Sequence, residues 1–459
     1  MMRLVTLAAL AFLTAMPAVQ AQSRATETTP QSRGIALDAA ERLLLERNLV
    51  LVAAQRGLDA ARAQRLVAAS MPPPNLSIGN TTGEVNEYGQ RLQATRFYWP
   101  TNNVAIGLSM VVEGSGRRSL RTRFAEEQIS IAEAQVLDIL RQQLFQLRQV
   151  FLQALLARAN LDVAEANKTS LDRTEALLRR QAQEGQIPEG DLLRFQASRP
   201  AMEADAAIAA QTYASAAAML AALLAEDPAI TSGSSATARP PLGNTGPVAL
   251  APSGRLQSNT ELGLTRDQIL AAAENRADVL VAKRNLSAAS ANRELAESQR
   301  TRDVTVGIIA GRTRLPQDLQ GTATANNQLG LSLSVPIFTS RIVEGNVGVA
   351  TAQQGQAEAM ARAALLGARA DAATAWIVWE QARALRALYD GGALRRAEEA
   401  YAVAERAYLA GGRSFIEVLD ALRTLNATRI AANQARHGAL LALANLEQAS
   451  GISGLMPRL

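Results

Sequence analysis

The chain has 459 residues, a formal net charge of +5, one histidine and no cysteine. The missing cysteines exclude disulfides, thiolate metal sites and a thioether lipid anchor, and the small, dispersed charge does not indicate nucleic-acid binding. Aromatic residues make up only 4% of the chain, and Ala, Leu, Arg, Glu and Gln predominate. This composition is typical of long helices rather than of ordinary globular domains.

Residues 1–21 have the pattern of a secretory signal peptide. Arg3 supplies a positive charge, Leu4–Met16 is an apolar run, and Val19–Ala21 offers small residues where signal peptidase cleaves. We therefore expect export and cleavage before Gln22, without lipidation. No later window reaches the ~18 charge-free apolar residues of a membrane helix. An exported chain of this kind is either a periplasmic protein or an outer-membrane barrel.

The remainder of the chain repeats itself. Three segments recur at offsets of 223, 228 and 226 residues, namely Ile106–Val112 with Leu329–Val335, Arg56–Ala61 with Arg284–Ala289, and Gly185–Leu193 with Gly411–Leu419. A nearly constant offset indicates two tandem copies, which we assign to residues 22–226 and 265–459. Residues 227–264 between them are rich in Pro, Gly, Ser and Thr, as expected of a linker or a loop-rich collar.

The first copy predicts a helix, a strand pair, a very long helix and a returning helix. The first helix covers residues 36–70, and the strands lie within about 75–113. Residues 117–184 contain neither Gly nor Pro, which predicts a helix roughly 100 Å long. After a turn, residues 191–226 return, and Pro200 predicts a kink or a break there.

The second copy predicts the same elements in the same order. A helix over 266–302 precedes strands within about 303–338, and a long helix over 348–409 is interrupted near Gly391. The returning helix ends at Ser450. Helices this long cannot be buried within one compact domain, so we expect them to lie side by side as a coiled coil or a helical barrel.

The predicted strands alternate between apolar and small or polar residues. Leu329, Leu331 and Leu333 alternate with glycine and serine, a pattern typical of outer-membrane strands. We expect Phe97–Trp99 and Phe338 to contribute to an interfacial aromatic girdle. A soluble sheet with one wet face is the alternative. Four strands cannot close a barrel, and lipid tolerates no open edge, so a membrane location requires several chains.

These features resemble the TolC family of outer-membrane efflux proteins over essentially the whole mature chain. The resemblance includes the strand end Val335–Phe338 and the turn-plus-helix segment Tyr408–Ala421. Glu113–Arg118 followed by Arg121 is similar to the Glu-x-x-Gly-Lys-Arg-x-x-Arg motif of the CzcC-like branch, with Arg117 in place of Lys. Members of that branch serve heavy-metal pumps of the resistance-nodulation-division type.

The resemblance implies an α+β membrane protein with four transmembrane strands and long antiparallel helices in each chain. A homotrimer would form a 12-stranded barrel in the outer-membrane lipid and a helical barrel crossing the periplasm. A periplasmic adaptor and an inner-membrane pump would dock at the hairpin tips. The tip residues implied are Gly185, Gln186, Ile187, Pro188, Gly411, Gly412 and Ser414.

The resemblance also implies a gate near the tips. Glu417 and Asp420 match the family's acidic rings, Arg413 matches the clasping base, and Asp191 matches its acidic partner. Residues three apart share a helix face, and rings of carboxylates select cations. The alternative is a solvated helix face, with Asp191 as the N-cap after Gly190.

No constellation for catalysis or for a cofactor is present. A solitary helical histidine, His437, supports neither a triad nor a transition-metal site, so we expect no enzyme, cofactor or resident metal. The function predicted is an exit duct for heavy-metal divalent cations. Drugs, other organic compounds or a secreted polypeptide are alternative cargoes, and a periplasmic coiled-coil scaffold without a pore is the alternative of another class.

Overall fold

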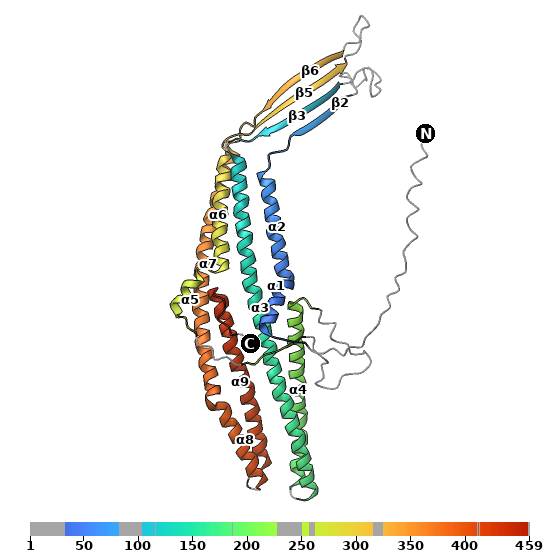
Figure 1. Ribbon diagram of the computed structural model, residues 1–459, viewed down its shortest axis with the longest axis vertical. Helices are drawn as coiled ribbons and strands as arrows, with labels where there is room; N and C mark the ends of the chain where they lie inside the picture. Colours follow the sequence, from blue (N-terminus) through green and yellow to red (C-terminus); the bar gives the residue numbers. More distant parts are fainter. Residues whose placement is uncertain are drawn as a thin grey trace, which may run out of the picture.

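The computed structural model describes a long rod, with a sheet at one end and helical hairpins at the other (Figure 1). The residues described are 33–81, 103–114, 116–185, 187–226, 250–256, 262–314, 325–410, 412 and 414–457. The expected signal peptide, Phe97–Trp99 and most of the 227–264 linker lie outside this part.

The helices follow the predicted order. They are α1 (Leu37–Arg47), α2 (Leu49–Ala69), α3 (Arg117–Gln183), α4 (Glu189–Leu223), α5 (Arg266–Ala273), α6 (Ala277–Ser298), α7 (Ser340–Leu388), α8 (Leu394–Leu409) and α9 (Phe415–Ser450). The strands are β1 (Arg33–Ile35), β2 (Asn75–Thr81), β3 (Asn103–Val112), β4 (Leu250–Pro252), β5 (Val304–Arg314) and β6 (Ala325–Ser334).

The first helix of each copy is divided in two, which the sequence did not predict. Asn48 separates α1 from α2, because its side-chain oxygen accepts hydrogen bonds from the amides of Val50 and Leu51 at 3.0 Å each and so caps α2. Residues 274–276 separate α5 from α6 at the corresponding place. In addition, α7 begins at Ser340 rather than at residue 348.

The two predicted helix breaks have opposite outcomes. Gly392 adopts a φ of 124° within a π-turn over Tyr389–Ala393, so the break between α7 and α8 is confirmed. A break at Pro200 is wrong, because α4 is continuous from Glu189 to Leu223. The turn containing Pro200 is fastened to α3 by ion pairs of the preceding residue, Arg199, and these contacts outweigh the missing backbone hydrogen bond.

The four-stranded sheet is antiparallel throughout, in the order β2-β3-β5-β6. Its register aligns Leu76, Leu108, Ile308 and Leu331 in one row across all four strands. The adjacent row on the same face contains Ile78, Ile106, Ala310 and Leu329. The alternation predicted from the sequence is therefore confirmed as one continuous apolar face.

The opposite face of the sheet carries mainly small and polar residues, with Val111 and Ile309 as its large apolar members. One of its rows contains Asn75, Ser109, Gly307 and Ser332. A Cβ at position 307 would lie 2.5 Å from the Ser332 hydroxyl oxygen, so a larger residue there would force the Ser332 side chain to move. Towards the loop end, the apolar face finishes in a row of Asn80, Val104, Arg312 and Asn327.

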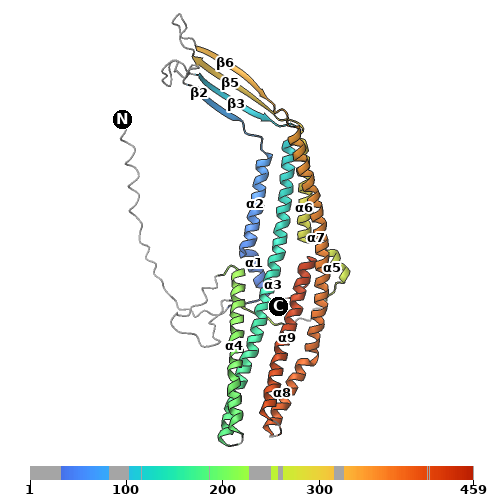
Figure 2. The same cartoon turned by 180° about the vertical axis from the view of Figure 1, so that it is seen from behind.

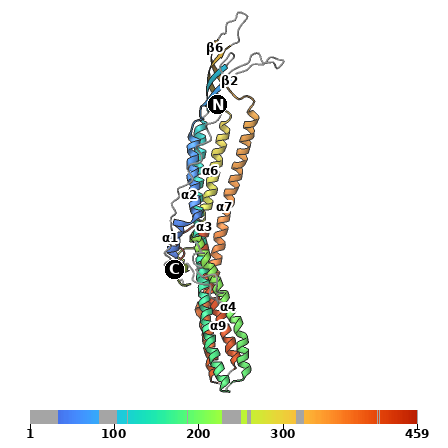
Figure 3. The same ribbon diagram turned by 90° about the vertical axis from the view of Figure 1, so that its right-hand side faces the viewer.

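Each strand of this sheet continues directly into one helix. As a result α2, α3, α6 and α7 lie side by side in the order of their strands (Figures 1 and 3). In the half away from the sheet, α4 packs on α3, α3 on α9, and α9 on α8. The chain therefore forms a curved helical layer of nearly constant width beneath the sheet.

A collar of short elements surrounds the middle of the rod, where the C-terminus also lies (Figure 2). Strand β1 pairs in parallel with β4, and both join α1 and the top of α4 around the fully buried Phe151 of α3. Arg148 of α3 bridges Glu41 and Glu447 at 2.7 Å each. The Glu447 carboxylate also accepts the amides of Gly454 and Met456, so it fixes the segment that follows α9.

One described helix segment, Leu192–Leu223 within α4, is long and apolar enough to cross a membrane by length and composition alone. One third of its most apolar window is buried inside the chain. The sequence predicted no membrane helix here because Asp205, Gln211 and Ser215 interrupt the apolar stretch. It packs along α3 for much of its length, which gives its alanine-rich face a partner within the protein.

Candidate functional site at the hairpin tips and the strand–helix joint

Two helical turns form the tips of the rod. Gly185 adopts a φ of 71° where α3 ends, and Pro188 occupies the N-cap of α4. Asp191 lies inside the first turn of α4, so the interpretation of Asp191 as the N-cap is wrong. At the other tip, Ser414 is the N-cap of α9.

Several of the predicted tip residues lie outside the described part of the chain. Ile187 and Gly412 lie within the two turns, as expected from their positions. The residues outside the described part are Gln186, Gly411 and Arg413, together with the side chain of Asp191. The clasp between Arg413 and Asp191 therefore stays a prediction.

An aromatic cluster binds the two hairpins together just above their turns. The Phe195 ring of α4 meets the Phe415 ring of α9 edge-on, with centroids 5.6 Å apart. The Tyr408 ring of α8 packs on the other side of Phe415 at 5.4 Å. The Tyr408 hydroxyl donates to the Gln181 side-chain oxygen of α3 at 3.2 Å, so all four helices meet here.

Glu417 and Asp420 lie on one exposed face of α9. The opposite face of the same helix is buried through Phe415, Val418 and Leu422. The Ser414 hydroxyl donates to the Glu417 carboxylate at 3.4 Å, and a negative charge is favoured at this N-terminal turn. The two carboxylates are therefore held on the same side of the tip, as their spacing predicts.

A charge network around the buried carboxylate of Glu175 lies one level above the aromatic cluster. Glu175 of α3 binds Arg199 of α4 and accepts a hydrogen bond from Gln196 at 3.2 Å. Arg199 also binds Asp172 at 2.5 Å and Glu203 at 2.7 Å. The hydrogen bond from Gln196 and the guanidinium of Arg199 hold the pKa of Glu175 below its ordinary value, although burial opposes this. Sequence reasoning missed this network, which no short motif marks.

A second charged contact holds the break between α7 and α8. Asp390 accepts hydrogen bonds from Arg386 at 3.1 Å and from Arg436 of α9 at 2.7 Å. Burial raises the pKa of Asp390, but the hydrogen bonds from Arg436 and Arg386 outweigh it and lower the pKa overall. The π-turn is thereby tied to α9, the helix that carries Glu417 and Asp420.

The motif Glu113–Arg118 with Arg121 forms a joint where the strands meet the helices. Arg121 donates to the carbonyl oxygens of Ala68 and Ser70 at 2.8 Å each, and to the Glu113 carboxylate at 2.5 Å. It therefore caps the C-terminal end of α2, where a cation is favoured.

Arg117 does the same for α6. It donates to the carbonyl oxygens of Ser298 at 3.2 Å and Thr301 at 2.7 Å, and it pairs with Asp303. Asp303 also accepts the amide of Gly114 at 3.2 Å. Two arginines of one motif thus cap the two helices on either side of α3, and Asp303 is a partner that the sequence did not reveal.

The described part of the chain holds no cluster of three His, Asp or Glu side chains that could bind a metal ion. His437 lies half-buried on α9, and burial lowers its pKa, so it is neutral at physiological pH.

Comparison with protein families matches residues 269–452 to the family described as Outer membrane efflux protein. This segment comprises α5 to α9 together with β5 and β6. The family expected from the sequence is the one whose model matches this segment, which is less than half of the chain; membership of the whole chain and of the heavy-metal branch stays a prediction. No curated protein sequence matches the chain.

Solved structures share the fold over nearly the whole chain. VceC from Vibrio cholerae superimposes with a TM-score of 0.68 at 18% identity, covering 90% of this chain and 96% of that one. The Campylobacter jejuni outer membrane channel CmeC superimposes with a TM-score of 0.71 at 16% identity, covering 90% of this chain and 85% of CmeC. The open state of the Neisseria gonorrhoeae outer membrane channel MtrE superimposes with a TM-score of 0.67 at 20% identity, covering 92% of this chain and 90% of MtrE. The chain therefore has the fold of these outer-membrane proteins.

We predict that Arg121→Lys destabilises the strand–helix joint. One ammonium group cannot reach two carbonyl oxygens and a carboxylate as the guanidinium does, so unfolding free energy should fall by about 1–3 kcal/mol. Thermal or denaturant unfolding of the purified protein measures this. Arg118→Lys is the matched control, because Arg118 is exposed; equal losses in the two variants would contradict the capping role.

We predict that acid loosens the Glu175 network. Because the folded-state pKa lies below the ordinary value of 4.5, Glu175 stabilises the fold above that value and loses this contribution as pH falls through the folded pKa. Hydrogen-exchange protection of α4 around Phe195 should therefore drop below about pH 4.5. Glu175→Gln should reduce protection at neutral pH and flatten the acid dependence; an unchanged acid profile would contradict the assignment.

Proposed function

We propose that this protein is a trimeric exit duct in the outer membrane of a cell envelope, belonging to a three-part efflux system. The observation that carries the proposal is the sheet β2-β3-β5-β6, which is apolar on one face and open at both edges. No single chain of this shape is stable in lipid by itself, because unpaired strand edges find no water there.

The exposed apolar rows support a lipid location. Leu331 and Leu329 are 85% and 76% exposed, and no described element covers them. A soluble sheet with a wet face would expose its polar side and bury this one. Lipid contact accounts for the apolar face, and a water-filled lumen accounts for the face of glycine and serine.

Symmetry supplies the missing strand partners. Strand β2 at one edge can pair with β6 of the next chain, and three copies of four strands make a barrel of twelve with no free edge. The helices α2 and α7 occupy the corresponding edges of the helical layer, so the same contact continues down the rod as a helical barrel through the periplasm.

The tips form the gate in this proposal. Threefold repetition of Glu417 and Asp420 creates two stacked carboxylate rings if their exposed face points into the tunnel. Arg413 and Asp191 would clasp neighbouring hairpins in the closed state. The tip residues Gly185–Pro188, Gly411, Gly412 and Ser414 are the proposed docking points for a periplasmic adaptor and an inner-membrane pump.

For the cargo, we propose heavy-metal divalent cations, on the basis of the Glu113–Arg121 motif and the acidic rings. The duct would act by width and electrostatics, with selection of a particular metal left to its partners. Drugs, other organic compounds or a polypeptide are the alternative cargoes. Growth of a deletion strain on zinc, cobalt, cadmium and nickel, against a panel of lipophilic drugs, separates these possibilities.

A coiled-coil scaffold without a pore is the candidate of another class. It accounts for the long helices but leaves the exposed apolar rows of the sheet without a role. A monodisperse protein that stays soluble without detergent would support the scaffold, and a heat-modifiable trimer that requires detergent would support the duct.

We predict that an arginine is tolerated on only one face of β6. Leu331→Arg places a charge in the lipid-facing row and should cost about 2–4 kcal/mol, reducing the yield of folded trimer in outer membranes. Ser332→Arg, the matched control on the next residue, points into the lumen and should assemble normally. Heat-modifiable mobility of membrane extracts measures both; equal assembly would contradict the lipid placement.

We predict that the combined change Glu417→Gln and Asp420→Asn reduces cation selectivity, because it removes six carboxylates from the narrowest part of the trimer. Single-channel recordings in planar bilayers under a salt gradient measure the selectivity. Glu380→Gln, an exposed carboxylate of α7 far from the tip, is the control. Unchanged selectivity in the tip variant would remove both residues from the gate.

A further inference from the structure

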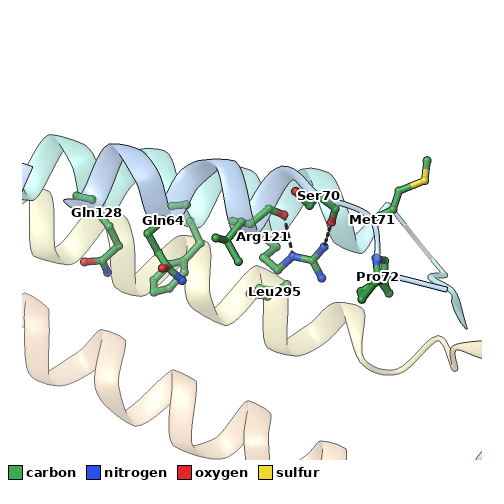
Figure 4. Close-up of a pocket in the computed structure, with 13 residues that line it drawn as sticks. Gln64, Ser70, Met71, Pro72, Arg121, Gln128 and Leu295 are labelled. Atoms are coloured by element: carbon green, nitrogen blue, oxygen red, sulfur yellow. Dashed lines mark hydrogen bonds between the residues drawn. The ribbon is translucent and has the colours of Figure 1, made fainter. Parts of the chain in front are cut away.

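A large pocket lies on the helical layer directly below the strand–helix joint. It has a volume of about 620 Å³ and is enclosed by α2, α3, one side chain of α6 and the Met71–Pro73 connection to β2 (Figure 4). Its walls are mainly apolar, with Val67, Met71, Phe124 and Leu295 among the lining side chains. This volume lies within the range of small-molecule binding sites in proteins.

The pocket has no net charge to offer a ligand. Arg121 is the only charged residue in its lining. Its guanidinium already binds the Ala68 and Ser70 carbonyl oxygens and is neutralised by Glu113. A charged ligand would therefore lose its hydration without gaining a counter-ion, so the lining favours an uncharged molecule.

Two amide side chains supply the polar contacts. Gln64 of α2 and Gln128 of α3 both line the pocket and are exposed, and both lie on the same side of the helices as Arg121 (Figure 4). Neither amide forms a side-chain hydrogen bond within the described part of the chain. Each can therefore donate to, or accept from, a bound molecule without breaking an existing contact.

The position of the pocket on α3 indicates where it opens. Farther along α3, Leu144, Leu147 and Phe151 pack against the collar elements α1 and β4. At 100° per residue, Phe124 lies about 140–200° around α3 from those residues and Gln128 about 100–160°, so both point away from the collar side. The collar must surround a conducting tunnel from outside, because it would otherwise block it, so the pocket opens towards the tunnel interior. This step rests on the proposed duct function.

We propose that this pocket is a binding site on the tunnel wall for an uncharged, lipophilic organic molecule carrying at least one hydrogen-bonding group. The apolar wall between α2 and α3 buries its hydrocarbon part, and Gln64 and Gln128 bind its polar group. The site lies near the membrane end of the tunnel, far from the carboxylates at the tip. It is therefore independent of any cation selection there.

The absence of native cysteine allows a direct test by thiol labelling. The trimer carrying Gln128→Cys is reconstituted in lipid vesicles and treated with a water-soluble maleimide, with and without N-phenyl-1-naphthylamine, an uncharged aromatic amine. The single N–H of the amine can still donate to the Gln64 side-chain oxygen in this variant, so we expect the amine to slow labelling saturably, at least several-fold. Gln142→Cys is the matched control, since this exposed glutamine lies on the same helix, about 21 Å away, and should be labelled at an unchanged rate.

A second variant tests the pocket wall. Phe124→Ala in the Gln128→Cys background should raise the half-protecting amine concentration on the order of tenfold, because an aromatic wall is lost. Equal slowing at both cysteines, or no slowing in trimers that still conduct ions, would overturn the pocket proposal while leaving the duct intact. A cysteine at 128 that resists labelling in intact trimers would mean that another copy of the chain covers the site, which also overturns it. Trimers that fail to conduct would contradict the duct itself.

Discussion

The pairing of β3 with β5 is the contact on which the rest of the structure depends, because it joins the two copies of the repeat into one sheet. Ten residues of β3, from Asn103 to Val112, pair in antiparallel register with β5. Because each strand continues into a helix, this register also fixes the order of α2, α3, α6 and α7 below. A shift by one residue would turn every apolar side chain of a strand towards the opposite face.

Charged contacts hold the helices in this order at three levels of the rod, namely the joint, the collar and the tips. At the joint, Arg121 and Arg117 hold the ends of α2 and α6 against the base of β3. At the collar, Arg148 connects α3 to Glu41 and Glu447. Near the tips, Arg199 ties α4 to α3. In each case arginine bridges two or more chain segments, which its planar group with five donors allows.

The sequence was sufficient to predict elements whose signal is local and long. The helix over 117–184 lacks Gly and Pro, and the strands alternate strictly, so both were predicted closely. Interruptions depended on context. Gly392 broke its helix as predicted, whereas Pro200 did not, because the ion pairs of Arg199 hold that turn in place. Asn48 divides α1 from α2 through its own side chain, a capping signal present in the sequence but hidden within an apolar run.

The positions of the candidate site residues were predictable only where the number of residues between two side chains on a helix determines whether they share a face. Glu417 and Asp420 share a face because they lie three residues apart on a helix. Partners from distant segments were not visible in the sequence, since Asp303 meets Arg117, and Gln181 meets Tyr408, only after the two copies have packed. The motif that resembles the metal-resistance branch caps two helices in this structure, a task defined by backbone carbonyl oxygens.

The π-turn at Tyr389–Ala393 can act as a hinge between α7 and α8. The pivot of this hinge is Asp390, which is bound to α9 through Arg436. The C-terminal end of α9 is anchored by Glu447. The arm is α8, which packs on α9 and has 16 residues, or a length of about 24 Å. A rotation of about 10° at the pivot would swing the arm's end by about 4 Å. In the trimeric duct proposed above, three such swings around the threefold axis would change the width of the opening at the tips.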